Sequence, residues 1–432
     1  MKALVIIGAG MAGVTAAQEA RQLHSKEELS ITIITNENPP SYTRPQLTDL
    51  LAGSIRPSDL VFRDEAWFKE RDIQLIYPAQ ATEIDVLEQK VYFTLRDSQQ
   101  ECSYHALILA TGSSAFSPFM PDSQSPAADT VFSLRTLEDV QKIRQHLAMK
   151  RKKAAVLGGG LLGLEAALAL KFTGVEEVHV LENSGYLLNR QLNRTASEML
   201  RLYLEREEGI VIHTGVHVDT NELRNRSVDE VLRPICSDGV ETLLYSMGVR
   251  SRIHLAKEAG LACGKGIIIN EETATSNPMI FATGDCAEFQ GITWAIIPSA
   301  LEQGKKAAQF ACWKLFSQPG QAKPELYHQT LPHTTITIGK REAVSTGKAV
   351  LTMEEENSGL WKNHELGSPL KRGQSRDGDL YVNLVENAET GIIVGGLAFG
   401  PQGSSVPWLS KLKHMMGKSW KEIERQELGG KE

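Results

Sequence analysis

Two short glycine-rich stretches constrain the fold of this chain more than any other feature of its sequence. The first, VIIGAGMAGVTAAQEA, starts at Val5, and the second, VLGGGLLGLEAALAL, covers residues 156–170. Each stretch contains a run of β-forming residues, then the glycines, then a helical pattern, which is the order of a strand–loop–helix unit. The first glycines of the two loops, Gly8 and Gly158, lie 158 − 8 = 150 residues apart, so the unit occurs twice.

A GxGxxG loop between a strand and a helix needs each glycine for a mechanical reason. The first glycine makes the tight turn, the second lets the backbone approach a pyrophosphate, and the third lets the helix pack closely on the strand. The helix N-terminus then offers N–H groups and a partial positive charge to the phosphates. The predicted binding residues are Gly8, Gly10, Met11, Ala12 and Gly13 in the first loop and Gly158, Gly160, Leu161, Leu162 and Gly163 in the second.

An acidic residue about 20 positions after such a loop accepts a hydrogen bond from a ribose 2′-OH. In the second unit Glu182 ends the strand VHVLE, 182 − 163 = 19 residues after the last glycine. Its carboxylate would repel the extra phosphate of NADPH, so NADH is the predicted nucleotide. In the first unit Glu37 is the corresponding choice, although an ordinary solvent-exposed turn glutamate explains that residue equally well.

Composition sets further limits. A chain of 432 residues is too long for one hydrophobic core, so two or three domains are expected. A net charge of −7 does not indicate a nucleic-acid-binding protein. The five cysteines are scattered without a CxxC pair, which indicates neither a disulfide framework nor a zinc site and suits a reducing cytoplasm. No stretch approaches the ~18 apolar residues that span a bilayer.

The distribution of strands and helices predicts an α/β fold with two nested Rossmann-like dinucleotide-binding domains plus a small C-terminal α+β domain. The apolar runs KALVII, LSITIIT, KAAVLG and VHVLE are typical of parallel strands that are buried on both faces. Helices are expected from Met11 to about Leu23 and from about Leu161 to Phe172. The segment EIDVLEQKVYFTL and the pair YVNLVE and GIIVGGLAF each predict an antiparallel hairpin.

Four further motifs make the chain resemble the FAD-dependent pyridine nucleotide-disulfide oxidoreductase superfamily, over roughly residues 1–345. These motifs are LILATG at 107–112, IFATGDCAEF at 280–289, PPSYTRPQL at 39–47 and MGVRSRIHLAKEAGL at 247–261. The last two resemble the PYxRPxLS and GVRPN segments of the branch that contains rubredoxin, ferredoxin and nitrite reductase flavoproteins. In the second of these, Ser251 and Arg252 replace the usual Pro-Asn.

The resemblance implies that the first loop holds FAD and the second holds NADH, so that a hydride passes from one cofactor to the other. It places Thr111, Gly112 and Asp285 along the pyrophosphate and ribityl chain of FAD, and Arg44 and Pro45 beside the flavin. The implied domains are residues 1–115 with 245–325 for FAD, 116–244 for NAD, and 326–432 for the C-terminal α+β domain.

The disulfide reductases of this superfamily carry a cysteine pair beside the flavin, but the corresponding segment here, SYTRPQLTD, contains no cysteine. Thiolate chemistry at the flavin is therefore not expected. The candidate catalytic residues are two carboxylates. Glu165 resembles the glutamate that pairs with a lysine near the flavin, but Asp49 occupies the lysine position. Two adjacent carboxylates would raise the pKa of one of them, and Arg44 could compensate.

No metal site is expected. His213 and His217 are four residues apart, but VIHTGVHV predicts a strand, in which that spacing separates the two side chains by about 13 Å. Packing or surface roles are favoured for both histidines, and Cys236 is interpreted as a structural cysteine.

The leading hypothesis is a cytoplasmic NADH-dependent FAD reductase that passes electrons to a small iron-sulfur carrier of the rubredoxin or ferredoxin type. The alternatives are an NADH oxidase, the flavin module of a nitrite or nitric oxide reducing system, and an NADH-binding redox-sensing flavoprotein. A homodimer is left open. Because carriers of this type are usually acidic, docking would need a basic patch, for which the candidates are Lys411, Lys413, Lys418 and Lys421, or Lys371 with Arg372.

Overall fold

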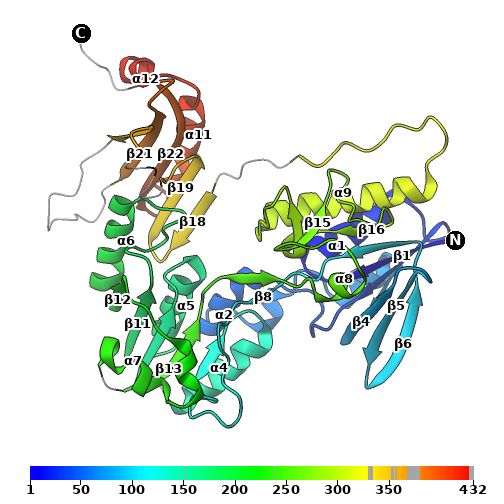
Figure 1. The fold of residues 1–432 in the computed structure, drawn as a ribbon, viewed down its shortest axis with the longest axis horizontal. Helices are drawn as coiled ribbons and strands as arrows, with labels where there is room; N and C mark the ends of the chain where they lie inside the picture. The colour runs from blue at the N-terminus through cyan, green and yellow to red at the C-terminus, as the bar shows by residue number, and fades with distance from the viewer. Residues whose placement is uncertain are drawn as a thin grey trace. The chain divides into compact units, whose positions relative to one another are not determined.

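The structure is a computed structural model of the chain, and it divides into two compact units (Figure 1). The described residues are 1–150, 152–237, 239–328, 334–351, 355, 358–366 and 380–427. Unit 1 comprises residues 1–47, 55–115 and 249–329, and unit 2 comprises residues 48–54, 116–248 and 330–432. Each unit contains one five-stranded parallel sheet, which confirms the predicted α/β fold with Rossmann-like elements.

Unit 1 is built on the parallel sheet β16-β7-β1-β2-β3. Its strands are β1 (Lys2–Ile7), β2 (Leu29–Ile34), β3 (Ile73–Ile76), β7 (Ala106–Leu109) and β16 (Ile280–Ala282). Two helices, α1 (Met11–Leu23) and α9 (Ile297–Phe316), pack on one face of this sheet and on each other. The small residues of both helices permit this contact, since a Cβ on Gly304 would lie 2.5 Å from the carbonyl oxygen of Ala12.

The other face of this sheet packs against a second layer of unit 1. That layer includes the antiparallel sheet β4 (Ala79–Asp85), β5 (Lys90–Leu95) and β6 (Ser98–Ser103), in which β4 and β5 form the predicted hairpin. The remaining short elements of unit 1 are α3 (Glu65–Glu70), β8 (Ser113–Ala115) paired with β14 (Val249–Ser251), α8 (His254–Glu258), and β15 (Ile267–Ile269) paired with β17 (Ala287–Phe289). Helix α2 (Leu47–Ala52) begins at the last residue of the first segment of unit 1, and its other residues belong to unit 2.

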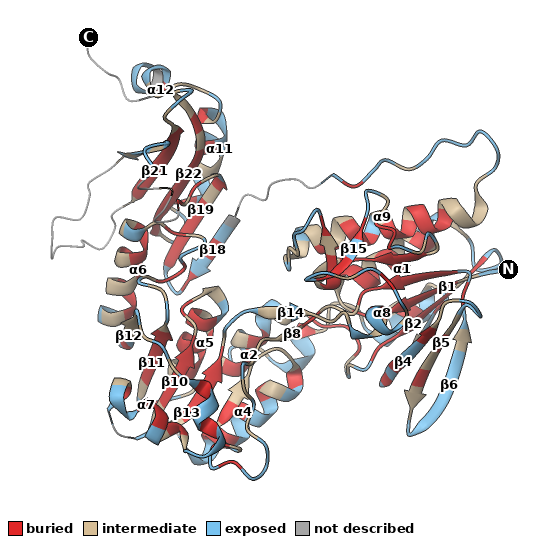
Figure 2. Cartoon of the chain, viewed as in Figure 1, coloured by how far each residue is buried: buried red, intermediate tan, exposed pale blue. Residues whose placement is uncertain are grey.

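Unit 2 repeats the same strand–loop–helix–strand order in the parallel sheet β12-β11-β10-β13-β9. Its strands are β9 (Val131–Ser133), β10 (Lys153–Leu157), β11 (Glu177–Glu182), β12 (Ile210–Thr214) and β13 (Val240–Tyr245), and its helices are α4 (Leu137–Met149), α5 (Leu161–Phe172), α6 (Arg194–Arg206) and α7 (Val228–Cys236). The central strands of both parallel sheets are buried, as their continuous apolar runs predict (Figure 2).

The C-terminal part of unit 2 is the antiparallel sheet β18-β19-β22-β21-β20 with helices α11 (Val406–Met415) and α12 (Trp420–Glu427). The strands are β18 (Thr334–Ile338), β19 (Arg341–Gly347), β20 (Trp361–Leu366), β21 (Tyr381–Asn387) and β22 (Ile392–Pro401). Strands β21 and β22 form the predicted hairpin. The sheet contacts α6, where Asn193 donates a 2.7 Å hydrogen bond to Tyr381 and the Lys340 amide donates one of 2.8 Å to Tyr203.

The division into three domains with the boundaries given above stays a prediction. Of the lysines considered for docking, Lys411 and Lys413 lie on α11 and Lys421 lies on α12, because Gly417, with a φ of +82°, ends the first helix. The other basic candidates, Lys371 and Arg372, lie outside the described residues.

Among the helices that the structure describes, none has both the length and the apolar composition to cross a membrane.

Candidate functional site

The first glycine loop is shaped by contacts that exclude side chains at two of its three glycines. A Cβ on Gly8, which has a φ of +109°, would lie 2.2 Å from the carbonyl oxygen of Ala110 on the neighbouring strand. A Cβ on Gly13 would lie 2.0 Å from the carbonyl oxygen of Gly8. At Gly10 the nearest atom is the tip of Arg44, at 3.7 Å. The second glycine therefore faces space that a ligand can occupy.

The second loop has the same construction in unit 2. A Cβ on Gly158, which has a φ of +120°, would lie 2.2 Å from the carbonyl oxygen of Ser246, and one on Gly163 would lie 2.0 Å from the carbonyl oxygen of Gly158. No heavy atom lies within 4 Å of a Cβ built on Gly160. Both loops thus leave open the position at which a pyrophosphate approaches the backbone.

The helix that follows each loop begins without a side-chain cap. Gly10 and Gly160 are the N-cap residues of α1 and α5, and neither helix has an acidic residue in its first turn. The first-turn positions are occupied by Met11 with Ala12 and by Leu161 with Leu162. The positive ends of both helices are therefore open to an anion, which is what phosphate binding at a helix N-terminus requires.

Glu182 lies beside the second loop, as its position at the end of β11 predicts. Its carboxylate accepts a 2.7 Å hydrogen bond from the amide of Gly159 and another of 2.7 Å from the amide of Ser184. These two amides fix the orientation of the carboxylate next to the glycines. The structure therefore brings the predicted acid and the predicted loop together.

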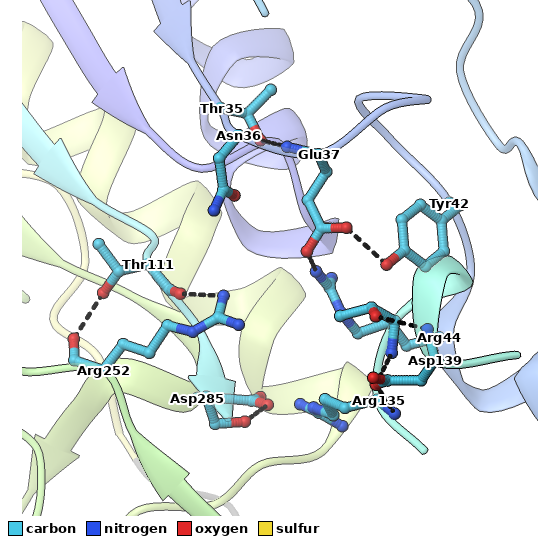
Figure 3. A network of polar contacts seen from close by, with 12 residues as sticks. Thr35, Asn36, Glu37, Tyr42, Arg44, Thr111, Arg135, Asp139, Arg252 and Asp285 are labelled. Atoms are coloured by element: carbon cyan, nitrogen blue, oxygen red, sulfur yellow. Dashed lines mark hydrogen bonds and ion pairs between the residues drawn. The ribbon is translucent and has the colours of Figure 1, made fainter. Parts of the chain in front are cut away.

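In unit 1 the carboxylate of Glu37 is held between two side chains (Figure 3). Arg44 Nη2 lies 2.5 Å from one carboxylate oxygen, and the Tyr42 hydroxyl donates a 2.6 Å hydrogen bond to the other. The side chains of Arg44 and Glu37 are 23% and 16% exposed, so this is a partly buried ion pair rather than a surface one. Because Arg44 also contacts the open side of Gly10, the pair lies next to the first loop. Pro45 follows as an exposed residue of a short 3₁₀ turn.

Asp285 also lies close to the start of α1. It follows Gly284, where a Cβ would lie 3.0 Å from the Cβ of Ala12. The Ser113 hydroxyl donates a 2.7 Å hydrogen bond to the Asp285 carboxylate, and the Ser251 hydroxyl donates one of 2.6 Å to the Asp285 carbonyl oxygen. The carboxylate therefore has a fixed position beside the first loop.

The two residues that depart from the resembled family pattern support this site, which the sequence analysis did not predict. Besides the contact of Ser251, the Arg252 carbonyl accepts a 2.8 Å hydrogen bond from the Thr111 hydroxyl (Figure 3). The Arg252 amide donates a hydrogen bond of 2.9 Å to the Gly112 carbonyl. Most of these bonds use backbone atoms, so side-chain chemistry gave no indication of them. The pairing of β8 with β14, which aligns these residues, was likewise not predicted.

Glu165 and Asp49 lie close enough to influence each other in unit 2. Burial, together with the negative charge of Asp49, raises the pKa of the Glu165 carboxyl to about 7. This is the effect expected of two neighbouring carboxylates. Arg44, considered as a compensating charge, forms its ion pair with Glu37. A catalytic role for Glu165 and Asp49 stays a prediction.

None of the described cysteines has the environment of an activated thiol. All five are free, and burial raises the pKa of each, to about 12 for Cys236 and Cys312. A thiol with a raised pKa stays protonated and is a poor nucleophile. This agrees with the expectation that no thiolate takes part in the chemistry.

Two glycine loops of the dinucleotide-binding type in one α/β chain indicate a protein that uses two nucleotide cofactors. The family model described as pyridine nucleotide-disulphide oxidoreductase matches residues 2–311. The chain belongs to this family, whose members are flavin-dependent NAD(P)H oxidoreductases that use FAD and NAD(H).

Relatives with established names extend over most of the chain. The NADH-rubredoxin oxidoreductase of Clostridium acetobutylicum is 32% identical over 346 residues, which is 80% of this chain and 81% of that protein. Its solved structure has a TM-score of 0.75 at 28% identity and covers 98% of this chain and 97% of the other. Putidaredoxin reductase CamA of Pseudomonas putida is 32% identical over 72% of this chain and 74% of its own length.

Other relatives are longer proteins. The assimilatory nitrate reductase electron transfer subunit of Bacillus subtilis is 30% identical over 87% of this chain, and a nitrite reductase of the same organism is 31% identical over 89%. The chain spans about half the length of these two curated relatives, 48% and 47% respectively.

The raised pKa of Glu165 predicts a specific pH dependence of stability. The folded protein holds a proton on Glu165 up to about pH 7, whereas the ordinary glutamate pKa is 4.5, so the free energy of unfolding falls as pH rises between these values. Glu165→Gln cannot ionise, so its melting temperature should rise relative to wild type as pH increases through this window. Melting curves across the window test this, with the exposed Glu83→Gln as the control. Parallel profiles for wild type and Glu165→Gln would contradict it.

Proposed function

We propose that this chain binds FAD at the first glycine loop and NADH at the second, and that it passes electrons from NADH through FAD to a small iron-sulfur protein. The observation that carries the proposal is the matched construction of the two loops. In each, the first and third glycines are required by backbone contacts, while the second faces open space at an uncapped helix N-terminus. Such a position fits a pyrophosphate, and no side chain of the described residues fills it.

In the proposed FAD site, each residue acts through its position beside α1. Arg44 offers positive charge next to Gly10, where the pyrophosphate would lie. Glu37, whose carboxylate is fixed by Arg44 and Tyr42, is the proposed partner of the adenosine ribose. Asp285, beside Ala12, is the proposed partner of the ribityl chain, and Thr111 and Gly112 line its path.

In the proposed NADH site, Gly160 leaves room for the pyrophosphate, and the Glu182 carboxylate accepts a hydrogen bond from the ribose. Because two amides already orient the Glu182 carboxylate, it is positioned to bind a 2′-hydroxyl and to repel a 2′-phosphate. FAD, when bound, accepts a hydride and can release its electrons singly. With a pKa of about 7, Glu165 can hold or release a proton at neutral pH, so Glu165 and Asp49 remain the proposed catalytic pair.

Two observations support an iron-sulfur acceptor. The segment SYTRPQLTD contains no cysteine, so no disulfide relay is available next to the proposed flavin site. Relatives of about 30% identity that match over most of their own length are named for rubredoxin and putidaredoxin. The alternative of an NADH oxidase is favoured by a protein of that name from Methanocaldococcus jannaschii, which is 33% identical over 66% of this chain.

The proposed docking surface for an acidic carrier lies on α11 and α12. Lys411, Lys413 and Lys421 are exposed there, and the Lys411 ammonium lies 4.6 Å from the centre of the Trp408 ring. The whole chain carries a net charge of −7, so attraction to an acidic partner depends on a local patch of this kind. A cytoplasmic location and a homodimer stay predictions.

Replacing the second glycine of one loop should abolish binding of the cofactor at that loop and leave the other cofactor bound. Neither Gly10→Val nor Gly160→Val strains the backbone, because φ is −71° and −79°, and neither Cβ meets a close backbone atom. Gly10→Val should therefore fold and purify colourless. Gly160→Val should stay yellow but lose NADH binding. Each variant is the control for the other, with flavin absorbance and NADH titration as readouts. Full retention of flavin in Gly10→Val would contradict the assignment of FAD to the first loop.

Glu182→Ala should weaken NADH binding by ~1.5–3 kcal/mol, about 10-fold or more in Kd, because a hydrogen bond to a charged acceptor is lost. The same change removes the repulsion of a 2′-phosphate and should reduce the difference between the Kd values for NADH and NADPH. Titration of both nucleotides measures this, with the exposed Glu176→Ala as a matched control on the segment leading into β11. A wild-type preference for NADPH is the result that would refute it.

Transfer to an acidic iron-sulfur carrier should fall steeply with ionic strength, because electrostatic docking acts mainly on the association rate. Turnover with added rubredoxin or ferredoxin measures this step, while flavin bleaching by NADH serves as the salt-insensitive control. Charge reversal at Lys411 and Lys413 should reproduce the high-salt behaviour. A small disulfide that proves the better acceptor would overturn the carrier-reductase proposal.

A further inference from the structure

Three side chains with metal-binding atoms meet in unit 2, apart from both glycine loops. They are His179 on β11, His213 on β12 and Cys236 at the end of α7, three elements that lie together in Figure 1. Their nitrogen and sulfur atoms all lie within 4.8 Å of one another. The parallel register explains the meeting of the histidines. Leu181 pairs with His213, so His179, two residues before Leu181, points to the same face of the sheet.

The cluster is largely removed from water. His179 is 3% exposed and Cys236 is 2% exposed, and His213 is half-buried. Cys236 belongs to the apolar core that α7 covers, together with Leu181 and Val240. His179 Nδ1 and His213 Nε2 lie 3.0 Å apart. Two Zn–N bonds of 2.0–2.1 Å that meet at a tetrahedral angle separate their nitrogens by roughly 3.3 Å, so a small shift of the rings suffices.

A carboxylate behind His179 provides a second, independent observation. The other ring nitrogen of His179, Nε2, lies 2.7 Å from Glu177 Oε1, and Lys153 lies 3.3 Å from the other oxygen of that carboxylate. A metal-binding histidine almost always donates its second N–H to a carboxylate or carbonyl, because that bond fixes the tautomer and raises the basicity of the ligand nitrogen. Glu177 thus directs the lone pair of Nδ1 toward His213 and Cys236.

We propose that His179 Nδ1, His213 Nε2 and Cys236 Sγ bind one Zn²⁺ ion, with Glu177 as the positioning residue for His179. Two imidazoles and one thiolate are ligands that Zn²⁺ accepts in tetrahedral sites, where water completes the coordination. On binding, the Cys236 S–H bond is replaced by an S–Zn bond and the proton leaves to solvent, with no change of oxidation state.

The protonation states in the metal-free protein are consistent with this step. Burial lowers the pKa of both histidines, which favours the neutral imidazole that a metal ion binds. Burial raises the pKa of the Cys236 thiol to about 12, so the proton that zinc displaces is present beforehand. The ion would tie the edge strand β12 and the end of α7 to β11, and this does not depend on the proposed cofactor assignments.

The test uses the full-length protein after removal of metal by a chelator and dialysis. Titration calorimetry with ZnCl₂ should give one site, release of about one proton per ion, and a rise in melting temperature. Co²⁺ in place of Zn²⁺ should add absorption at longer wavelengths than oxidised flavin. His213→Ala and Cys236→Ser should abolish the site. Glu177→Gln, which leaves all three ligands in place, should weaken binding about 10- to 100-fold.

Matched controls are available in the same chain. His217→Ala, just beyond β12, and Cys263→Ser, in unit 1, should bind zinc as wild type does. If Cys236→Ser fails to fold, the zinc affinity of the Glu177→Gln variant still tests the proposal. The proposal is overturned if wild type binds no stoichiometric zinc, or if Glu177→Gln binds as tightly as the control variants. Either result would mean that the cluster is an ordinary histidine–histidine hydrogen bond in the core.

Discussion

The structure depends on one close backbone contact, which occurs in both units. In unit 1 the Cα of Gly8 lies against the carbonyl of Ala110, and in unit 2 the Cα of Gly158 lies against the carbonyl of Ser246. A Cβ at either glycine would overlap a backbone oxygen that belongs to a core strand end and has no room to move. This contact turns the chain from a central strand directly into a helix whose N-terminus is open.

The candidate binding groups are arranged around that turn. Because α1 begins directly after the first loop, the Arg44–Glu37 pair and Asp285 can all lie near its first turn although they come from distant segments. In unit 2 the same turn places Glu182 within hydrogen-bond distance of Gly159. Both candidate nucleotide sites are therefore built on the same strand–loop–helix turn. The differences between the two sites come from the residues next to that turn.

Much of this could be predicted from the sequence because the relevant patterns are local. The bounds of α1 and α5 follow from an apolar strand, a glycine loop and a helix-forming run, and Glu182 follows from spacing along one βαβ unit. The contacts of Arg252 with Thr111 and Gly112 could not be predicted, since they use the backbone of Arg252 and join segments more than 100 residues apart. The proposed zinc ligands were missed for a similar reason, because His179 meets His213 only through the register of two strands.

The central claim is that the second loop delivers reducing equivalents to a flavin held by the first. It is tested most directly by mixing the yellow protein with NADH deuterated at the transferred position, without oxygen, in a stopped-flow spectrophotometer. The flavin should bleach rapidly at saturating NADH, and more slowly with the deuterated nucleotide than with ordinary NADH. A flavin that stays oxidised at saturating NADH would show that the second loop does not deliver reducing equivalents to it.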